Sequence, residues 1–277
     1  MNIVEIACPR CGSPIGNFND GKIRLFEKCT NCLFDIKKLK EVPILRECED
    51  INLNMLDAVD NLEPYNSFDL GIPFVNKALA SSLPTLQIGG GIDLCSATNL
   101  LKTDAFLYSE KMHLIADAHS LPFPDETFSY VYSLAVFEHL HSPWIAADEI
   151  FRVLKPEGEV YVLTAFMQHE HGYPDHYFNM TASGLKRIFS NFEIQEVKPS
   201  IHSNFDQLSY ILLDFMKMVD EADLGEDSAL SKNILNHSVK EFCNSVKKLD
   251  QKLLASDLST INFQKISPSM ELVARKR

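Results

Sequence analysis

Four cysteines near the N-terminus have the residue types and the spacing of a metal site. They form two Cys-x-x-Cys pairs, Cys8/Cys11 and Cys29/Cys32, separated by the seventeen residues 12–28. Each pair offers two thiolates from one tight turn, and four thiolates complete the tetrahedral shell that Zn²⁺ prefers. No position is then left for water, so we expect a structural zinc ion and not a catalytic one. A redox pair is the alternative, but the βαβ pattern that surrounds such pairs is missing here.

Four histidines form a second group with chemical potential: His139, His169, His171 and His176. They follow segments that we expect to be strands, where a substrate would approach a parallel sheet. An imidazole can accept the proton of a hydroxyl group near neutral pH. We therefore expect one of these histidines to be a general base. The sequence leaves metal binding and a purely structural role open.

Three consecutive glycines, Gly89 to Gly91, follow an apolar segment. Without side chains, the backbone can turn sharply there and approach a ligand closely. The G-x-G-x-x-G spacing of dinucleotide-binding loops is missing, because Leu94 stands at the position of the third glycine. This counts against a nicotinamide-dependent dehydrogenase.

Alternating strands and helices must position these residues. We expect strands at 83–88, 113–116, 128–133 and 159–164, and a helix at 144–154 whose apolar residues recur at helical spacing. Such alternation predicts a parallel sheet with right-handed crossovers. The expected fold class is therefore α/β.

The chain divides into three parts by composition. Residues 1–45 carry the cysteine pairs and are too few to bury a core without a metal, so we expect a zinc ribbon. Residues 46–70 are acidic and irregular, as in a linker. Residues 71–277 hold the alternating pattern and form the main domain.

The C-terminal part of the main domain is expected to contain a helical insertion. Residues 203–258 carry apolar positions at helical spacing and are expected to pack on the core, with a lid or a homodimer surface as alternatives. A last pair of strands is expected at 261–266 and 270–274.

Composition limits the classes of function. The net charge of −12 lowers the expectation of a nucleic-acid partner, because proteins that bind phosphate backbones usually show a basic face. No apolar run approaches the roughly 18 residues that span a bilayer, and the first residues do not form a signal peptide. We expect a cytoplasmic protein without a membrane partner.

Three motifs closely resemble class I S-adenosylmethionine-dependent methyltransferases of the methyltransferase type 11 kind. Residues 116–128 (ADAHSLPFPDETF) are similar to the family's DAxxLPFxDxxFD stretch, residues 136–140 (VFEHL) to its VLEHL, and residues 152–158 (RVLKPEG) to its RVLKPGG turn. They occur in the family's order within roughly residues 83–195. The resemblance implies a Rossmann-like fold for residues 71–277, with S-adenosylmethionine as the cofactor.

Two weaker resemblances concern substrate and partner. Residues 171–185 are similar to a stretch found in a subgroup of these enzymes often met near glycan biosynthesis. The cysteine pairs and residues 41–45 (EVPIL) resemble the Trm112-like zinc ribbon, a small domain often found beside methyltransferases. That likeness implies an interaction or substrate-presenting role.

The family resemblance also implies roles for individual residues. Gly89 and Gly91 would form the loop beneath the methionine part of the cofactor. Asp104 would accept hydrogen bonds from the ribose hydroxyls, since a carboxylate offers two acceptor oxygens. Asp117 would meet the adenine amino group, and the backbone amide of Ala118 would contact a ring nitrogen.

Two positions depart from the family pattern. Gln87 replaces the acid of the first strand, which orients the glycine loop and helps to hold the cofactor's ammonium group, and Asp93 takes the place of a glycine. Cofactor binding is therefore expected to be weakened or lost. The helix after the loop is expected to be short, because Asp104 follows Gly91 by thirteen residues.

Three functions remain open at this point. The expected one is O-methylation of a small molecule or a glycan. Methylation of a base in ribosomal or transfer RNA is the second, because a zinc ribbon precedes this fold in such enzymes. The third is a degenerate methyltransferase fold that acts as a binding module, which the departures at Gln87 and Asp93 would explain.

Overall fold

The structure is a computed structural model that describes residues 3–46, 67, 69–91, 93–108, 111–168, 170–171, 175–200, 241 and 269–277. Except for residue 241, the predicted helical insertion lies outside these ranges. The predicted strand at 261–266, most of the predicted linker and His169 also lie outside them.

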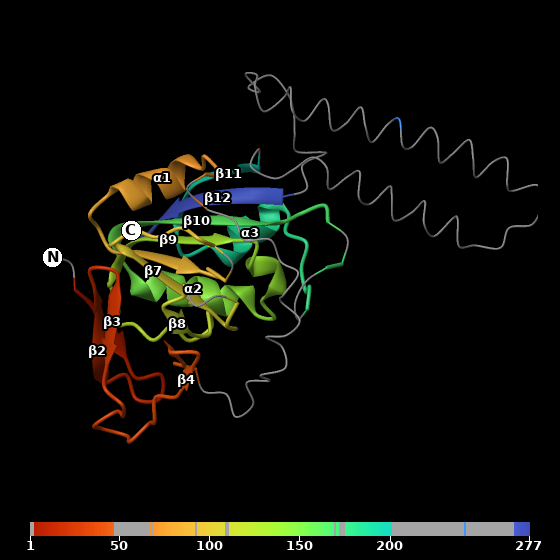
Figure 1. Cartoon of the computed structure of the whole chain (residues 1–277). Coiled ribbons are helices and arrows are strands. Elements are labelled where there is room, and N and C mark those ends of the chain that lie inside the picture. Colours follow the sequence, from red (N-terminus) through yellow and green to blue (C-terminus); the bar gives the residue numbers. More distant parts are fainter. Residues whose placement is uncertain are drawn as a thin grey trace, which may run out of the picture.

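A seven-stranded sheet forms the centre of the main domain (Figure 1). Its order is β11-β12-β10-β9-β6-β7-β8, and every neighbouring pair from β10 to β8 is parallel. The strands are β6 (Thr85–Ile88), β7 (Leu100–Asp104), β8 (Leu114–Ile115), β9 (Phe128–Leu134), β10 (Leu154–Ala165), β11 (Glu193–Pro199) and β12 (Ser269–Arg275). This arrangement confirms the predicted Rossmann-like α/β class. The predicted strand at 270–274 is confirmed as β12, which runs antiparallel to both β10 and β11.

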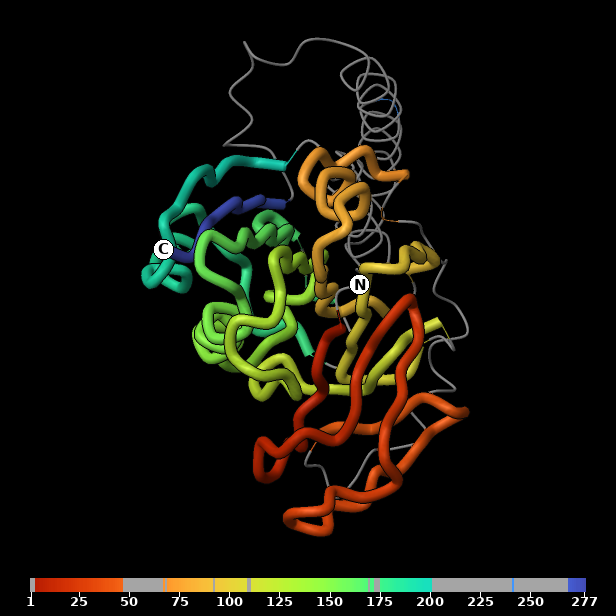
Figure 2. Tube along the Cα trace, turned by 90° about the vertical axis from the view of Figure 1, so that its left-hand side faces the viewer, coloured from red at the N-terminus to blue at the C-terminus, as the bar shows by residue number. Residues whose placement is uncertain are grey.

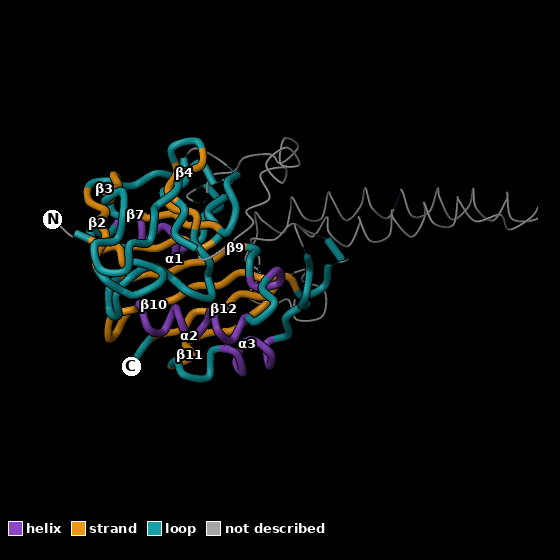
Figure 3. Tube along the Cα trace, turned by 90° about the horizontal axis from the view of Figure 1, so that it is seen from below, coloured by secondary structure: helices purple, strands orange, loops and turns teal. Residues whose placement is uncertain are grey.

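Helices cover both faces of the sheet (Figure 3). They are α1 (Pro73–Ala80), α2 (Pro143–Val153) and α3 (Ala182–Ile188). On one face, Phe74 of α1 stacks on Tyr161 of β10 with ring centroids 5.5 Å apart. On the other face, α2 buries Ile150 against the strands. None of the helices in the described ranges is long and apolar enough to cross a bilayer.

The predicted helix after the glycine loop is wrong. Residues 93–99 form no helix: residue 93 lies in an isolated bridge, 94–97 are irregular and 98–99 form a turn. The Asp93 carboxylate accepts hydrogen bonds from the backbone N–H groups of Cys95 at 2.8 Å and Ser67 at 3.0 Å. An aspartate that bonds the backbone two residues ahead favours a turn over a helix, which explains the difference.

The N-terminal segment packs on the edge of the sheet that ends in β8 (Figure 2). It contains two small antiparallel sheets, β1-β2-β3 and β4-β5. Their strands are β1 (Val4–Ala7), β2 (Pro14–Asn19), β3 (Lys22–Leu25), β4 (Lys38–Leu39) and β5 (Val42–Pro43). The backbone N–H of Leu45 donates to the carbonyl of Ile115 at 2.8 Å, and Ala7 donates to Pro122 at 2.9 Å. The segment is thus hydrogen-bonded to the main domain through its own backbone.

Candidate functional site

A cavity of about 200 Å³ opens where β6, β7, β8 and β9 reach their carboxyl ends. Ligands of open α/β sheets bind at this edge. Of the residues singled out in the sequence, five line it: Gly89, Asp104, Asp117, Ala118 and His139. The other lining residues are Arg46, Ile88, Ala105, Phe106, Ala116, His119, Val136, Leu140, His141 and Tyr177.

The glycine turn leaves no room for side chains. Gly89 has φ of 75°, and a Cβ placed on it would overlap Cγ2 of Val136. A Cβ on Gly91 would lie 2.6 Å from Cδ2 of Tyr108. The backbone at the end of β6 is therefore a cradle in which only glycine fits at these two positions.

The two departures from the family pattern are bonded to each other beneath this turn. Gln87 Nε2 donates to Asp93 Oδ2 at 2.8 Å, and both side chains are fully buried. Buried Lys102 adds a bond from its Nζ to the backbone carbonyl of Asp93 at 2.7 Å, and burial lowers its pKa. Gln87 Oε1 is buried without a hydrogen-bond partner in the described ranges. A buried acid, Asp93, thus lies against the side chain of Gln87 beneath the turn, and one amide oxygen has no donor among the described residues.

Asp104 ends β7 on the wall of the cavity. Its Oδ2 accepts a hydrogen bond from the Gly91 backbone N–H at 3.0 Å, and its Oδ1 accepts one from Phe106 at 3.3 Å. Removal of the carboxyl from bulk water raises its pKa to about 7, against the opposing effect of these bonds and of Arg46. A carboxylate with this pKa gains from additional hydrogen-bond donors, such as a pair of hydroxyl groups.

Asp117 follows β8 and forms a pair with His119. Asp117 Oδ1 accepts hydrogen bonds from the His119 backbone at 2.9 Å and from its ring Nδ1 at 2.7 Å, and the side-chain bond lowers the Asp117 pKa to about 2. The His119 ring stacks on that of His141 with centroids 4.2 Å apart, and its Nε2 is buried without a partner among the described residues. Asp117 therefore faces the cavity as a carboxylate.

Arg46 is a cavity residue that the sequence did not reveal. Its Nη1 donates to the Ala105 carbonyl at 2.7 Å, and its guanidinium lies 5.7 Å from the centre of the Phe106 ring. The sequence predicted a linker from this position onward. Its placement depends on the packing of the N-terminal segment against β8, which no local sequence pattern reports.

Three of the four candidate catalytic histidines lie together at the rim of the cavity. The ring centroid of His139 is 5.3 Å from that of His171 and 5.7 Å from that of His176. His139 Nδ1 donates to the Asp175 carbonyl at 2.7 Å, which leaves Nε2 as the basic nitrogen. His176 uses both nitrogens, because Nε2 donates to the Phe178 carbonyl at 3.1 Å and Nδ1 accepts from the His171 backbone at 3.3 Å.

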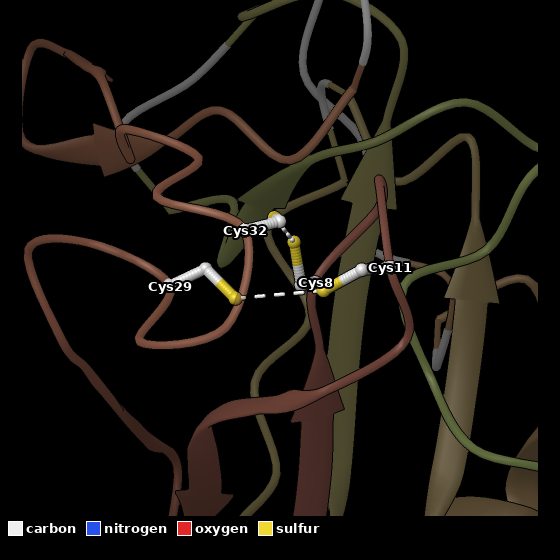
Figure 4. Close-up of side chains that lie close together, drawn as sticks. All are labelled: Cys8, Cys11, Cys29 and Cys32. Atoms are coloured by element: carbon white, nitrogen blue, oxygen red, sulfur yellow. Dashed lines mark hydrogen bonds between the residues drawn. The ribbon is translucent and has the colours of Figure 1, made fainter.

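The four predicted cysteine ligands converge at the N-terminal segment (Figure 4). Cys8 Sγ lies 3.5 Å from Cys32 Sγ, and Cys11 Sγ lies 3.6 Å from Cys29 Sγ. All four sulfur atoms lie within 4.8 Å of one another. Zn–S bonds of about 2.3 Å in a tetrahedron place sulfur atoms roughly 3.8 Å apart, so the cluster matches the size of a zinc site.

Both cysteine pairs lie in the same kind of turn. The residue after the second cysteine, Gly12 or Leu33, has a positive φ, and its N–H donates to the carbonyl of the first cysteine at 2.9 Å or 3.0 Å. Hydrogen bonding to Ser13 lowers the pKa of Cys11 to about 6. The backbone therefore brings two thiol groups of each pair to one side, as a shared metal ion would require.

Comparison with known proteins finds similarity to methyltransferases over part of the main domain. A family model described as a methyltransferase domain matches residues 91–162. Cycloartenol-C-24-methyltransferase 1 of Oryza sativa subsp. japonica is 34% identical over 113 residues, 41% of this chain and 31% of the relative. Sterol 24-C-methyltransferase erg6 of Schizosaccharomyces pombe is 30% identical over 128 residues, 46% of this chain and 30% of the relative. The chain thus spans less than a third of the length of either relative.

Among solved structures, phosphoethanolamine N-methyltransferase 2 of Haemonchus contortus, bound to S-adenosyl-L-methionine, is 15% identical with a TM-score of 0.43. The match covers 80% of this chain and 56% of that one. The strand order and the match over residues 91–162 agree with each other. Residues 91–162 of this Rossmann-like sheet thus match the model of a methyltransferase domain, and a segment with a four-cysteine cluster precedes them.

Proposed function

We propose that this chain is an S-adenosylmethionine-dependent methyltransferase that methylates an oxygen atom of a small molecule or a glycan. The observation that carries the proposal is the placement of Asp104 and Asp117 on one cavity wall, beside the glycine turn at Gly89. Two carboxylates at the ends of adjacent strands are suited to hold a nucleoside by its hydroxyl and amino groups.

Several residues of the cavity are suited to parts of this cofactor. Asp104 would accept hydrogen bonds from the ribose hydroxyls, and Asp117 would accept one from the adenine amino group. The backbone N–H of Ala118, which has no hydrogen-bond partner in the described ranges, would donate to a ring nitrogen. At the other end, the turn at Gly89, which lines the cavity, would lie beneath the methionine part.

The bonded pair of Gln87 and Asp93 argues against the degenerate alternative. The buried oxygen of Gln87 has no hydrogen-bond partner among the described residues and could accept a bond from a donor that enters beneath the turn. Asp93 would take over the orientation of the loop, because its carboxylate already binds the backbone of Ser67 and Cys95. The network thus keeps an acid beneath the turn although its position in the sequence has changed.

Bound S-adenosylmethionine supplies an activated methyl group on a sulfonium ion. The chain itself must place the acceptor and help it to lose a proton. The rim histidines are suited to both roles, because His139 borders the cavity and keeps Nε2 available, and His171 lies beside it. His176 would position His171 through the backbone bond, since both of its nitrogens are occupied.

For the N-terminal segment we propose a structural zinc ion held by Cys8, Cys11, Cys29 and Cys32, in a Trm112-like ribbon. The spacing of the four sulfur atoms supports it. The zinc would stabilise a segment whose two small sheets are short. The expected cytoplasmic location would keep the four cysteines reduced, as zinc binding requires.

Transfer of a tritiated methyl group tests the proposal. The protein is incubated with methyl-labelled S-adenosylmethionine and, in separate reactions, with mixtures of phenols, soluble glycans, and ribosomal and transfer RNA. We expect label in a hydroxyl-bearing small molecule or glycan, and loss of that label in Asp104→Ala. Label in RNA would assign the ribbon-containing RNA enzyme class instead. Binding of the cofactor with no transfer to any class would favour the binding-module alternative.

A further inference from the structure

A second set of metal-binding side chains lies at the rim of the cavity. We define the carboxylate–imidazole cluster as Glu138, His139 and His171. A carboxylate oxygen of Glu138 and one ring nitrogen of each histidine lie within 4.8 Å of one another. Glu138 and His139 belong to the single turn η2 (Phe137–His139) that follows β9, and His171 lies in the connection after β10. Two neighbouring strand ends therefore bring the three side chains together.

Burial of Glu138 is the first argument for a bound cation. The residue is 1% exposed, and the Thr164 hydroxyl donates to its Oε2 at 2.8 Å. Within the described part of the chain, this is the one hydrogen bond that the carboxylate accepts. A buried carboxylate with a single neutral donor loses several kcal/mol of hydration, which a cation can restore. The two imidazole rings beside Glu138 are neutral when they bind a metal ion, so they add ligands to the site without adding positive charge.

The hydrogen bonds behind the cluster are the second argument. Metal-binding histidines usually donate their other ring N–H to a carbonyl or carboxylate, and ligating carboxylates are hydrogen-bonded in turn. His139 Nδ1 donates to the Asp175 carbonyl at 2.7 Å, which fixes its ring and directs Nε2 as the ligand atom. Thr164 holds Glu138 in the same way. His176 holds the backbone of His171 at 3.3 Å.

We propose that Glu138, His139 and His171 bind a divalent first-row transition metal ion such as Mn²⁺, Fe²⁺, Co²⁺ or Zn²⁺. Two imidazoles and one carboxylate suit these ions better than Mg²⁺ or Ca²⁺, which prefer oxygen ligands. Three protein ligands leave coordination positions open, as in catalytic and not structural sites.

The position of the cluster gives the metal ion a role in catalysis. This role rests on the proposed methyltransferase function. His139 belongs to the cavity wall, so an open coordination position there is available to an acceptor. A metal ion lowers the pKa of a hydroxyl group that it coordinates. The acceptor would release its proton to water, and the oxygen would form a bond to the methyl carbon as the sulfur–carbon bond breaks and sulfur keeps the electron pair. The acceptor class is thus a hydroxyl compound able to coordinate a metal, such as a vicinal diol or a phenol.

Equilibrium dialysis with Mn²⁺ tests the metal site directly. Mn²⁺ is the probe because four thiolates select Zn²⁺, whereas carboxylate and imidazole accept Mn²⁺. We expect one Mn²⁺ per zinc-loaded chain and at least tenfold weaker binding in Glu138→Gln and His171→Ala. Thr164→Val keeps all three ligands but removes the supporting hydroxyl, and should weaken binding by roughly 10-fold or more. Glu41→Gln, an exposed carboxylate of the N-terminal segment, should bind as the wild type does.

Two results would overturn the proposal: no saturable Mn²⁺ or Co²⁺ binding by the wild type, or binding that survives both ligand substitutions. Thermal melting by circular dichroism shows which variants are folded, and His171→Ala, in a loop, serves if Glu138→Gln does not fold. Dialysis contains neither cofactor nor acceptor. If the protein binds S-adenosylhomocysteine but no Mn²⁺, the metal site is rejected and the proposed methyltransferase function stands. His139 Nε2 would then act as the base.

Discussion

Replacement of the Asp104 carboxylate by an amide should stabilise the free protein and weaken cofactor binding at the same time. The pKa of about 7 exceeds the ordinary value of 3.8 by about 3 units, or roughly 4 kcal/mol at 1.36 kcal/mol per unit. Between about pH 4 and pH 7 the unfolded chain releases this proton while the folded chain keeps it, so stability falls as pH rises. Above pH 7 the loss of folding stability no longer changes with pH. The value of 4 kcal/mol is its upper limit, because the Asp104 carboxyl borders the open cavity, where water reduces the cost of its charge.

Asp104→Asn removes this loss but keeps only one acceptor oxygen for the two backbone N–H donors, which costs about 1–2 kcal/mol. We therefore expect a net gain of about 2 kcal/mol in the free energy of unfolding at pH 8, and no gain or a small loss at pH 4. Urea denaturation at both pH values measures it, with exposed Asp69→Asn as the control. Destabilisation of Asp104→Asn at pH 8, or a difference that does not change with pH, would refute the reasoning.

Three further changes follow from the same contacts. Gly89→Ala should lower the free energy of unfolding by about 2–4 kcal/mol in urea denaturation, through its positive φ and its overlap with Val136. Arg46→Gln should move the pH midpoint of S-adenosylhomocysteine binding upward from about 7, measured by calorimetry, because Arg46 helps to lower the Asp104 pKa. Cys29→Ser should release zinc, measured by emission spectrometry, and weaken S-adenosylhomocysteine binding, since the segment that carries Arg46 is bonded to β8.

Each of these variants has a matched control. Gly71 has φ of 67° with no atom near its missing Cβ, so Gly71→Ala should show only the backbone cost of about 1 kcal/mol. An equal loss in both glycine variants would contradict the overlap with Val136. Exposed Arg24→Gln should leave the pH midpoint unchanged. Cys95→Ala should retain zinc, and full zinc content in Cys29→Ser would remove the basis for the ribbon.

Features encoded by neighbouring residues were predictable from the sequence. The spacing of the cysteine pairs placed four sulfur atoms together, and the alternation of apolar runs with a helix indicated strands β6, β8, β9 and β10 of the sheet. Strand β11 was not predicted, because three of its seven residues are exposed and it shows no buried apolar run. Strand β7 was not predicted either, although four of its five residues are buried, because the polar residues 102–104 interrupt its apolar run.

Features that depend on tertiary packing were not predictable. Gln87 and Asp93 are separate departures from the family pattern in the sequence, and only the structure shows that the two side chains are hydrogen-bonded to each other. The same bond network removed the expected helix after the glycine loop. Arg46 reaches the cavity because the backbone of Leu45 pairs with Ile115, far away in the sequence.

Calorimetric titration of the zinc-loaded protein with S-adenosylhomocysteine at pH 8 tests most directly whether the cavity is a nucleoside site. We predict one molecule bound per chain, with at least tenfold weaker binding in both Asp104→Ala and Asp117→Ala. No heat of binding at millimolar ligand, or affinity unchanged by both substitutions, would contradict a nucleoside site between these two carboxylates.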